Sequence, residues 1–169
     1  VAGGRAAMRI AVHVGLEEPE QYYTAGLVHD IGKVLIADRM RSEFAEICGI
    51  VAERGILVRD AEEEVLACDH AAVGAWLLQW WQLPDGLVRA AANHHRVGAE
   101  GARDPMAAVV HLADVMVRAE CFGWGGDPSI PELRPATLNI LNMDIGDVED
   151  IMKGLPDVMD TVKRCWRTA

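Results

Sequence analysis

Apolar residues recur along the start of the chain at intervals of three and four, the spacing of one face of an α-helix. Val1–Val14 has this spacing from its first residue, and a second helix is expected over Glu18–His29, where Pro19 suits a first helical position. Arg41–Arg54 is amphipathic, and Gly55 follows it as a helix stop. Because the first helix begins without a capping residue, we expect the sequence to begin inside a longer protein.

The helical spacing continues in the middle of the chain. A long helix is predicted over Ala61–Trp81, with Asp60 as its cap. Its expected core stripe consists of Val65, Cys68, Ala72, Ala75 and Leu78. Pro84 opens a helix that runs to His94 or His95.

Asp104-Pro105 is a cap followed by a proline, and it opens a helix to about Cys121. The glycines and prolines of Gly123–Pro135 predict an irregular segment, followed by two short helices with Asp144 and Pro156 near their starts. No strand pattern and no internal repeat is found. The prediction is therefore a single all-α domain over residues 1–169.

Charge and hydropathy exclude several classes of function. The net charge is −10, from 26 acidic and 16 basic residues, and no basic cluster interrupts it. Such a surface repels nucleic-acid phosphates and acidic membranes. No apolar run reaches the roughly 18 residues of a membrane span, and no signal peptide is apparent. We therefore expect neither nucleic acid nor membrane as a partner.

The cysteines are far apart and form no C-x-x-C pair, which excludes the common zinc-finger spacings and gives no disulfide framework. They are Cys48, Cys68, Cys121 and Cys165. Because all four stand among apolar helical residues, we expect buried free thiols in a reducing, cytoplasmic setting.

Histidines and aspartates stand near one another at several helix ends. The residues are His29, Asp30, His70, His94, His95, His111 and Asp114. Asp30 precedes a break in the helical pattern, where Gly32 permits a tight bend. His70 lies inside the long predicted helix, and His111 and Asp114 share a face of a later one.

Imidazole and carboxylate are ligands of Zn, Fe, Mn and Ni, so the residue types do not distinguish these metals. Helical bundles build mono- and dinuclear sites from ligands on several helices. A bridging aspartate with histidines on each side would leave positions for water, and the ions would activate that water and polarise a phosphoryl oxygen. We therefore predict a pocket for one or two divalent transition-metal ions.

Each residue alone has a simpler interpretation. A single His70 is typical of a helix surface or core, and the His94-His95 pair could cap a helix C-terminus. Asp114 stands between two apolar residues, and a buried carboxylate needs a partner. The separate interpretations fit each position but fit the whole set poorly.

Other candidates are given structural roles. His13, on the first helix, is more typical of a surface or core histidine than of a ligand. His111 stands one turn before Asp114 and is expected to orient that aspartate, with ligation as the alternative. The three tryptophans of the long helix are expected in the core or on a partner surface; they are Trp76, Trp80 and Trp81.

The ordered series resembles the HD superfamily of metal-dependent phosphohydrolases. Its members here are His29-Asp30, His70, His94-His95 and Asp114. The surroundings resemble the HDOD subgroup in TAGLVHDIGKVLI, CDHAAVGAWLLQWWQLPDGLVRAAANHH and AVVHLADVMVRA. The segment ATLNILNMDIGDVEDIMKGL resembles the end of HDOD domains, so the similarity covers nearly the whole chain.

This resemblance implies an HD-type helical bundle with a metal pocket among its central helices. The implied metal ligands are His29, Asp30, His70, His94, His95 and Asp114. Asp30 would bridge the ions if two bind. Lys33 matches the lysine near substrate phosphate in catalytic relatives, which makes Asp30 and Lys33 the candidate catalytic residues. The alternative for Lys33 is a surface lysine at a helix start.

The sequence departs from the superfamily at two points. An early histidine helps to hold the metal in mononuclear members, but His13 is too close to His29 to match it, so we expect that ligand to precede Val1. The glycine-tyrosine-proline motif of the cyclic-di-GMP phosphodiesterase branch is replaced by RVGAEGARDP. Hydrolysis of cyclic-di-GMP is therefore not supported.

Two functions remain after these comparisons of motif and chemistry. The first is a metal-dependent phosphohydrolase that acts on a nucleotide or another phosphate-containing small molecule in signal transduction. The second is a non-catalytic HDOD scaffold that contacts other signalling domains or proteins and holds a structural or vestigial metal. A helical interaction domain without metal leaves the ordered residues unexplained.

Overall fold

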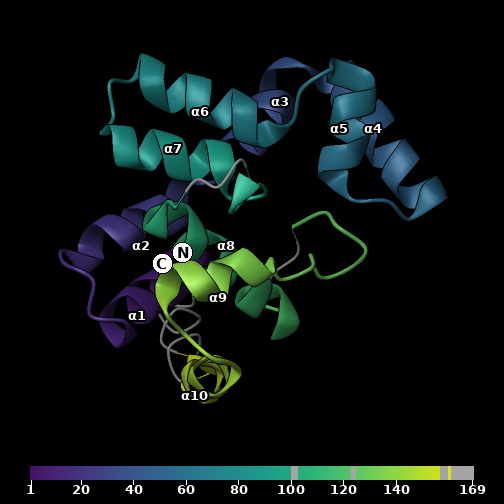
Figure 1. Ribbon diagram of the computed structural model, residues 1–169. Helices are drawn as coiled ribbons and strands as arrows, with labels where there is room; N and C mark the ends of the chain where they lie inside the picture. The colour runs from purple at the N-terminus through teal and green to yellow at the C-terminus, as the bar shows by residue number, and fades with distance from the viewer. Residues whose placement is uncertain (100–102, 123–124, 157–159, 161–169) are drawn as a thin grey trace.

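The fold is entirely helical in the part of the chain that the computed structural model describes, which is residues 1–99, 103–122, 125–156 and 160. Figure 1 shows the arrangement. The first five helices are α1 (Ala2–His13), α2 (Pro19–Val28), α3 (Ile31–Arg39), α4 (Arg41–Arg54) and α5 (Val58–Leu66). They are followed by α6 (His70–Trp80), α7 (Asp85–Asn93), α8 (Pro105–Ala119), α9 (Pro135–Leu141) and α10 (Ile145–Lys153). The predicted all-α class is confirmed.

Three apolar clusters hold these helices together. The largest joins α1, α8 and the C-terminal helices through residues such as Ile10, Leu112 and Ile151. A second, with Ile36 and Ile47, joins α3, α4 and α5. The third joins α2, α7 and α8 through Ala25, Leu87, Ala90 and Val110. In Figure 1, α6 and α7 lie side by side at the upper left, with α4 and α5 at the upper right and α1, α2 and α8 below them.

Several predicted boundaries agree with the structure. Helix α4 begins at Arg41 and ends at Arg54, and Gly55 follows in the left-handed region, with φ of 65°. The carboxylate of Asp104 caps α8 by accepting from two backbone amides of its first turn. Asp144 caps α10 in a capping box. The helix expected near Pro156 lies largely outside the described residues.

The long helix predicted over Ala61–Trp81 is wrong, because α5 and α6 are separate helices. Ala67 adopts a left-handed conformation, with φ of 57°, and the side chain of Asp69 caps α6. Asp60 lies inside α5 and caps nothing. The expected core stripe is confirmed only at Leu78, which is buried; Ala72 is exposed, whereas Ala71 and Leu77 are buried.

Two further expectations are corrected. Cys48 and Cys121 are exposed and Cys68 is half-buried, so these three free thiols are not core residues; Cys165 lies outside the described part of the chain. The tryptophans Trp76, Trp80 and Trp81 are exposed, so the core alternative is wrong and the partner surface stays a prediction. The indoles of Trp76 and Trp80 stack with their centroids 6.4 Å apart.

Helix length and polarity also bear on membrane contact. None of the helices in the described residues is long and apolar enough to cross a bilayer.

Candidate metal centre

The predicted ligands stand at helix ends that meet in the centre of the bundle. His29 is the C-terminal cap of α2, and Asp30 is the N-terminal cap of α3. His70 is the first residue of α6, not a mid-helix residue as predicted. His94 caps the C-terminus of α7, and His95 follows it. Ends of four helices thus supply the cluster.

Two glycines allow α3 and α6 to approach so closely. A Cβ atom on Gly32 would lie 2.0 Å from the carbonyl oxygen of His70 and 2.8 Å from the backbone nitrogen of Gly74. Gly32 lies within α3 and not in a bend, so its predicted role as a turn residue is wrong. Its missing side chain instead brings the start of α6, with His70, beside Asp30.

Three imidazoles converge on one oxygen of Asp30. Its Oδ1 atom lies 3.5 Å from Nε2 of His29, 3.2 Å from Nε2 of His70 and 3.6 Å from Nε2 of His94. Oδ1 of Asp30 and the Nε2 atoms of His29 and His94 are buried and have no hydrogen-bond partner. Buried polar atoms without partners are costly, and a cation among these three would satisfy all of them. The residues present therefore fit a bound metal.

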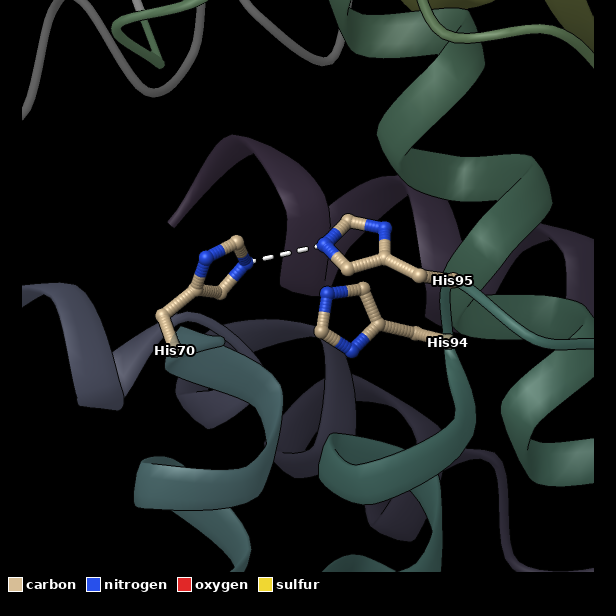
Figure 2. Close-up of side chains that lie close together, drawn as sticks. All are labelled: His70, His94 and His95. Atoms are coloured by element: carbon tan, nitrogen blue, oxygen red, sulfur yellow. Dashed lines mark hydrogen bonds between the residues drawn. The ribbon is translucent and has the colours of Figure 1, made fainter. Parts of the chain in front are cut away.

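A second group of ligand atoms adjoins the first. The Nε2 atoms of His70 and His95 are 2.9 Å apart, and the rings of His94 and His95 have centroids 3.9 Å apart. Figure 2 shows the three rings of His70, His94 and His95 facing one another. His94 belongs both to this group and to the group of His29 and Asp30, and in each the ligand atoms lie within 4.8 Å of one another. The buried His/Asp cluster could hold a divalent metal.

Asp114 lies at the edge of the cluster. Its Oδ1 atom is 3.9 Å from Nε2 of His29 and accepts a hydrogen bond of 3.0 Å from Nε of Arg118. Arg118 also pairs with Asp127. Although burial lowers the pKa of the guanidinium, these two aspartates raise it above its usual value. Asp114 is thus held beside the pocket by an arginine.

Backbone carbonyls orient two of the imidazoles. Nδ1 of His29 lies 3.1 Å from the carbonyl oxygen of Gly26, and Nδ1 of His94 lies 2.7 Å from that of Ala91. A carbonyl oxygen only accepts, so each Nδ1 must carry the proton. The Nε2 lone pair of both rings then faces the cluster, as metal ligation requires.

Glu62, on α5, is a carboxylate behind His70 and is fully buried. One of its oxygens accepts a hydrogen bond of 2.8 Å from the backbone amide of His70 and lies 2.5 Å from Nδ1 of the same residue. This carboxylate fixes both the start of α6 and the orientation of its imidazole.

The ionisation states in the cluster follow from burial and charge. Burial raises the pKa of Asp30, but the neighbouring histidines and Lys33 lower it well below its usual value. Burial lowers the pKa of His94 and of His95, so both rings are neutral near pH 7 and able to ligate. Burial also opposes a charge on His70, yet the carboxylates of Asp30, 3.2 Å from its Nε2, and of Glu62 raise its pKa to about 9.

Lys33 lies at the cluster and is mostly buried, with 16% of its side chain exposed. Its ammonium donates to Oδ2 of Asp30 at 2.9 Å and to the carbonyl oxygen of Gly125 at 3.3 Å. A cavity of about 250 Å³ opens beside it, lined in part by His29, Asp30 and Asp114. A small anion entering this cavity would meet the candidate ligands.

The two remaining histidines lie elsewhere. His13 pairs with Asp147 of α10 at 3.1 Å, away from the cluster. Nε2 of His111 accepts a hydrogen bond from the backbone amide of Arg134 at 3.1 Å, and the ring also bonds with the backbone of His94. The structure therefore places His111 as a support for the His94 backbone, whereas the expected contact was with Asp114.

Comparisons with known proteins agree with this architecture. A sequence model of the HDOD domain matches residues 1–97. An uncharacterized protein of Treponema pallidum (strain Nichols) is 28% identical over 97 residues, which make up 57% of this chain and 19% of that protein. The chain therefore spans a fifth of this relative's length.

Solved structures match over nearly the whole chain. An HDOD domain protein of unknown function from Geobacter sulfurreducens aligns with a TM-score of 0.82 at 24% identity, over 96% of this chain and 58% of that one. A candidate phosphohydrolase from Shewanella amazonensis SB2B gives 0.69 at 24% identity, over 90% and 56%. A candidate signal transduction protein from Marinobacter aquaeolei VT8 gives 0.76 at 18% identity, over 98% and 38%. At these identities the likeness concerns the fold.

Proposed function

This chain belongs to the HDOD domain family, and we propose that it binds a divalent transition metal and hydrolyses a phosphate ester, such as a nucleotide, in signal transduction. The observation that carries the proposal is the convergence of buried, unpartnered ligand atoms from His29, Asp30 and His94 beside a cavity. A purely structural cluster would be expected to satisfy these atoms within the protein. The solved phosphohydrolase candidate with the same fold supports the reaction class by analogy.

The proposed ligands are His29, Asp30, His70, His94, His95 and Asp114. Bound divalent ions would supply Lewis acidity toward a phosphoryl oxygen and lower the pKa of water. Asp30 stays ionised at neutral pH because its pKa is lowered, so it offers a carboxylate to the metal. Lys33 stands beside the same carboxylate and would stabilise negative charge on the phosphoryl oxygens.

Metal content tests the proposal first. The purified chain should carry one or two equivalents of a transition metal, and the Asp30→Ala variant should lose them. Asp38→Ala, an exposed aspartate on α3, is the matched control and should keep the metal. Nucleotides and generic phosphate esters are then screened for hydrolysis with the loaded protein. A chain that takes up no metal, or a loaded chain that hydrolyses none of these esters, contradicts the proposal.

A second candidate is a non-catalytic scaffold that contacts other signalling domains. The exposed stack of Trp76 and Trp80 favours it, because large exposed apolar surfaces often mark protein contacts. The screen distinguishes the two functions: a loaded protein without turnover favours the scaffold with a structural metal.

A further inference from the structure

An apolar cavity of about 440 Å³ lies on the α4–α5 side of the metal centre. Its walls include Phe44, Ile47 and Val51 from α4, Val58 from α5, and Pro128. Lys33 is the one charged residue among the described residues that line it. The volume lies within the range of roughly 300–1,000 Å³ typical of small-molecule sites.

Two residues connect this cavity with the metal centre. Lys33 lines the apolar cavity, and its ammonium donates to Oδ2 of Asp30. Gly125 lines both the apolar cavity and the smaller cavity of about 250 Å³ that contains His29 and Asp30. The ammonium of Lys33 also donates to the carbonyl oxygen of Gly125. An ammonium has three N–H groups, so one is left for an anion at the junction of the two cavities.

We infer that the apolar cavity binds the organic group of a phosphate ester whose phosphoryl group lies at the metal centre. The inference rests on the proposed function and narrows its substrate class to esters of apolar alcohols. Charge complementarity supports this occupant. The ammonium of Lys33, which would attract a phosphate group, lies where the apolar wall meets the candidate metal-binding cluster. A sugar or a base would need hydrogen-bond partners that apolar walls do not offer.

Binding of phosphonates tests the subsite separately from turnover, because their carbon–phosphorus bond is not hydrolysed. Methyl-, butyl- and hexylphosphonate are titrated calorimetrically into the full metal-loaded chain. Each methylene buried in the cavity should tighten binding by up to about fourfold. Equal affinities across the series, or the absence of binding by all three compounds, would overturn the inference.

Two matched variants locate the site of binding. Ala52→Trp adds a large side chain on an exposed position of α4 that lines the cavity. Ala72→Trp makes the same change on an exposed position of α6, in a separate apolar groove of about 650 Å³ beside Trp76 and Trp80. The dependence on chain length should disappear with Ala52→Trp and persist with Ala72→Trp. The opposite result would assign the binding to the tryptophan groove and overturn the inference.

Parallel hydrolysis assays with methyl and hexyl phosphate separate the two claims. Turnover of both esters with equal KM would leave the phosphohydrolase proposal standing and remove the apolar subsite. A length-dependent affinity for phosphonates without turnover of either ester would keep the subsite and remove the hydrolase.

Discussion

At the scale of single residues, Glu62 decides how His70 is presented to the cluster. Its carboxylate contacts both the backbone amide and Nδ1 of His70, and it is fully buried. A carboxylate behind a ligating imidazole fixes the ring and increases its basicity. Without Glu62 and Asp30, burial would lower the pKa of this imidazole.

We therefore predict that Glu62→Gln weakens metal binding by about 10- to 100-fold. The amide oxygen can still accept both hydrogen bonds, but the side chain no longer provides a negative charge behind His70. Metal titration of the chelator-treated protein measures the change. Glu63→Gln is the control, since Glu63 is exposed and pairs with Arg96 at 3.1 Å. Equal affinities for the two variants would contradict this role of Glu62.

His111 provides a pH-dependent prediction at the same scale. Burial lowers its pKa to about 4, from 6.5 in an unfolded chain. Between these pH values the unfolded chain takes up a proton that the folded chain excludes. The free energy of unfolding should therefore fall as the pH falls from 6.5 to 4, with His111 contributing about 3 kcal/mol over the whole window.

Urea denaturation of the chelated protein at several pH values measures this contribution. His111→Gln should show a shallower loss of stability through the window, because glutamine does not titrate. The unaltered chain is the reference. If His111→Gln has the same pH dependence as the unaltered chain, His111 is not the group responsible.

The sequence indicated the residues of the candidate cluster better than it indicated their supports. His29, Asp30 and His94 could be identified because their order along the chain resembles a known series. Glu62 could not, since a glutamate among other acidic residues near a helix start is usually solvated. Glu62 stands eight residues before His70 in the sequence. Helical periodicity predicts no contact between them, because the helix breaks at Ala67.

At the scale of helices, the crossing of α3 and α6 depends on Gly32. We predict that Gly32→Ala destabilises the fold by about 3 kcal/mol, because a Cβ atom 2.0 Å from the carbonyl oxygen of His70 must push the helices apart. The same displacement separates His70 from Asp30, so metal affinity should fall as well. Denaturation and metal titration measure the two effects.

Gly49 provides the matched control for this substitution. It lies inside α4, is exposed, and would have no neighbour within 4 Å of an added Cβ atom. Gly49→Ala should stabilise the protein by about 0.5–1 kcal/mol, because alanine is the better helix former. A Gly32→Ala variant as stable as Gly49→Ala would show that the crossing tolerates a side chain.

Helix boundaries were predictable where a residue with a strong local preference stands at the end. Gly55 ends α4 because glycine adopts a left-handed conformation without strain. The break after α5 was missed because Ala67, which favours helix, adopts that conformation instead. Asp69, the cap of α6, was the available signal, and tertiary contacts of His70 with Glu62 stabilise the break.

At the scale of the whole molecule, the candidate ligands lie between the apolar clusters and not inside one. His29 follows α2, Asp30 precedes α3, and His70 and His94 belong to the ends of α6 and α7. Helices α2 and α7 pack against each other and against α8, and α6 packs against α3 and α7. A bound ion would therefore link helices whose packing is otherwise divided among separate cores.

This arrangement predicts where metal slows amide hydrogen exchange. Metal at 100 times its dissociation constant stabilises the folded state by about 2.7 kcal/mol, which slows exchange through openings of the site by about 100-fold. We expect this slowing at the ends of α2, α3, α6 and α7 that carry the ligands. Helix α10 carries no proposed ligand and should exchange at the same rate with and without metal.

Hydrogen exchange read by mass spectrometry measures both regions, with Asp30→Ala as the control that should lose the effect. Uniform slowing over α10 as well would mean that these amides exchange by global unfolding, whereas no slowing at the ligand-bearing ends would contradict a metal centre between these helices.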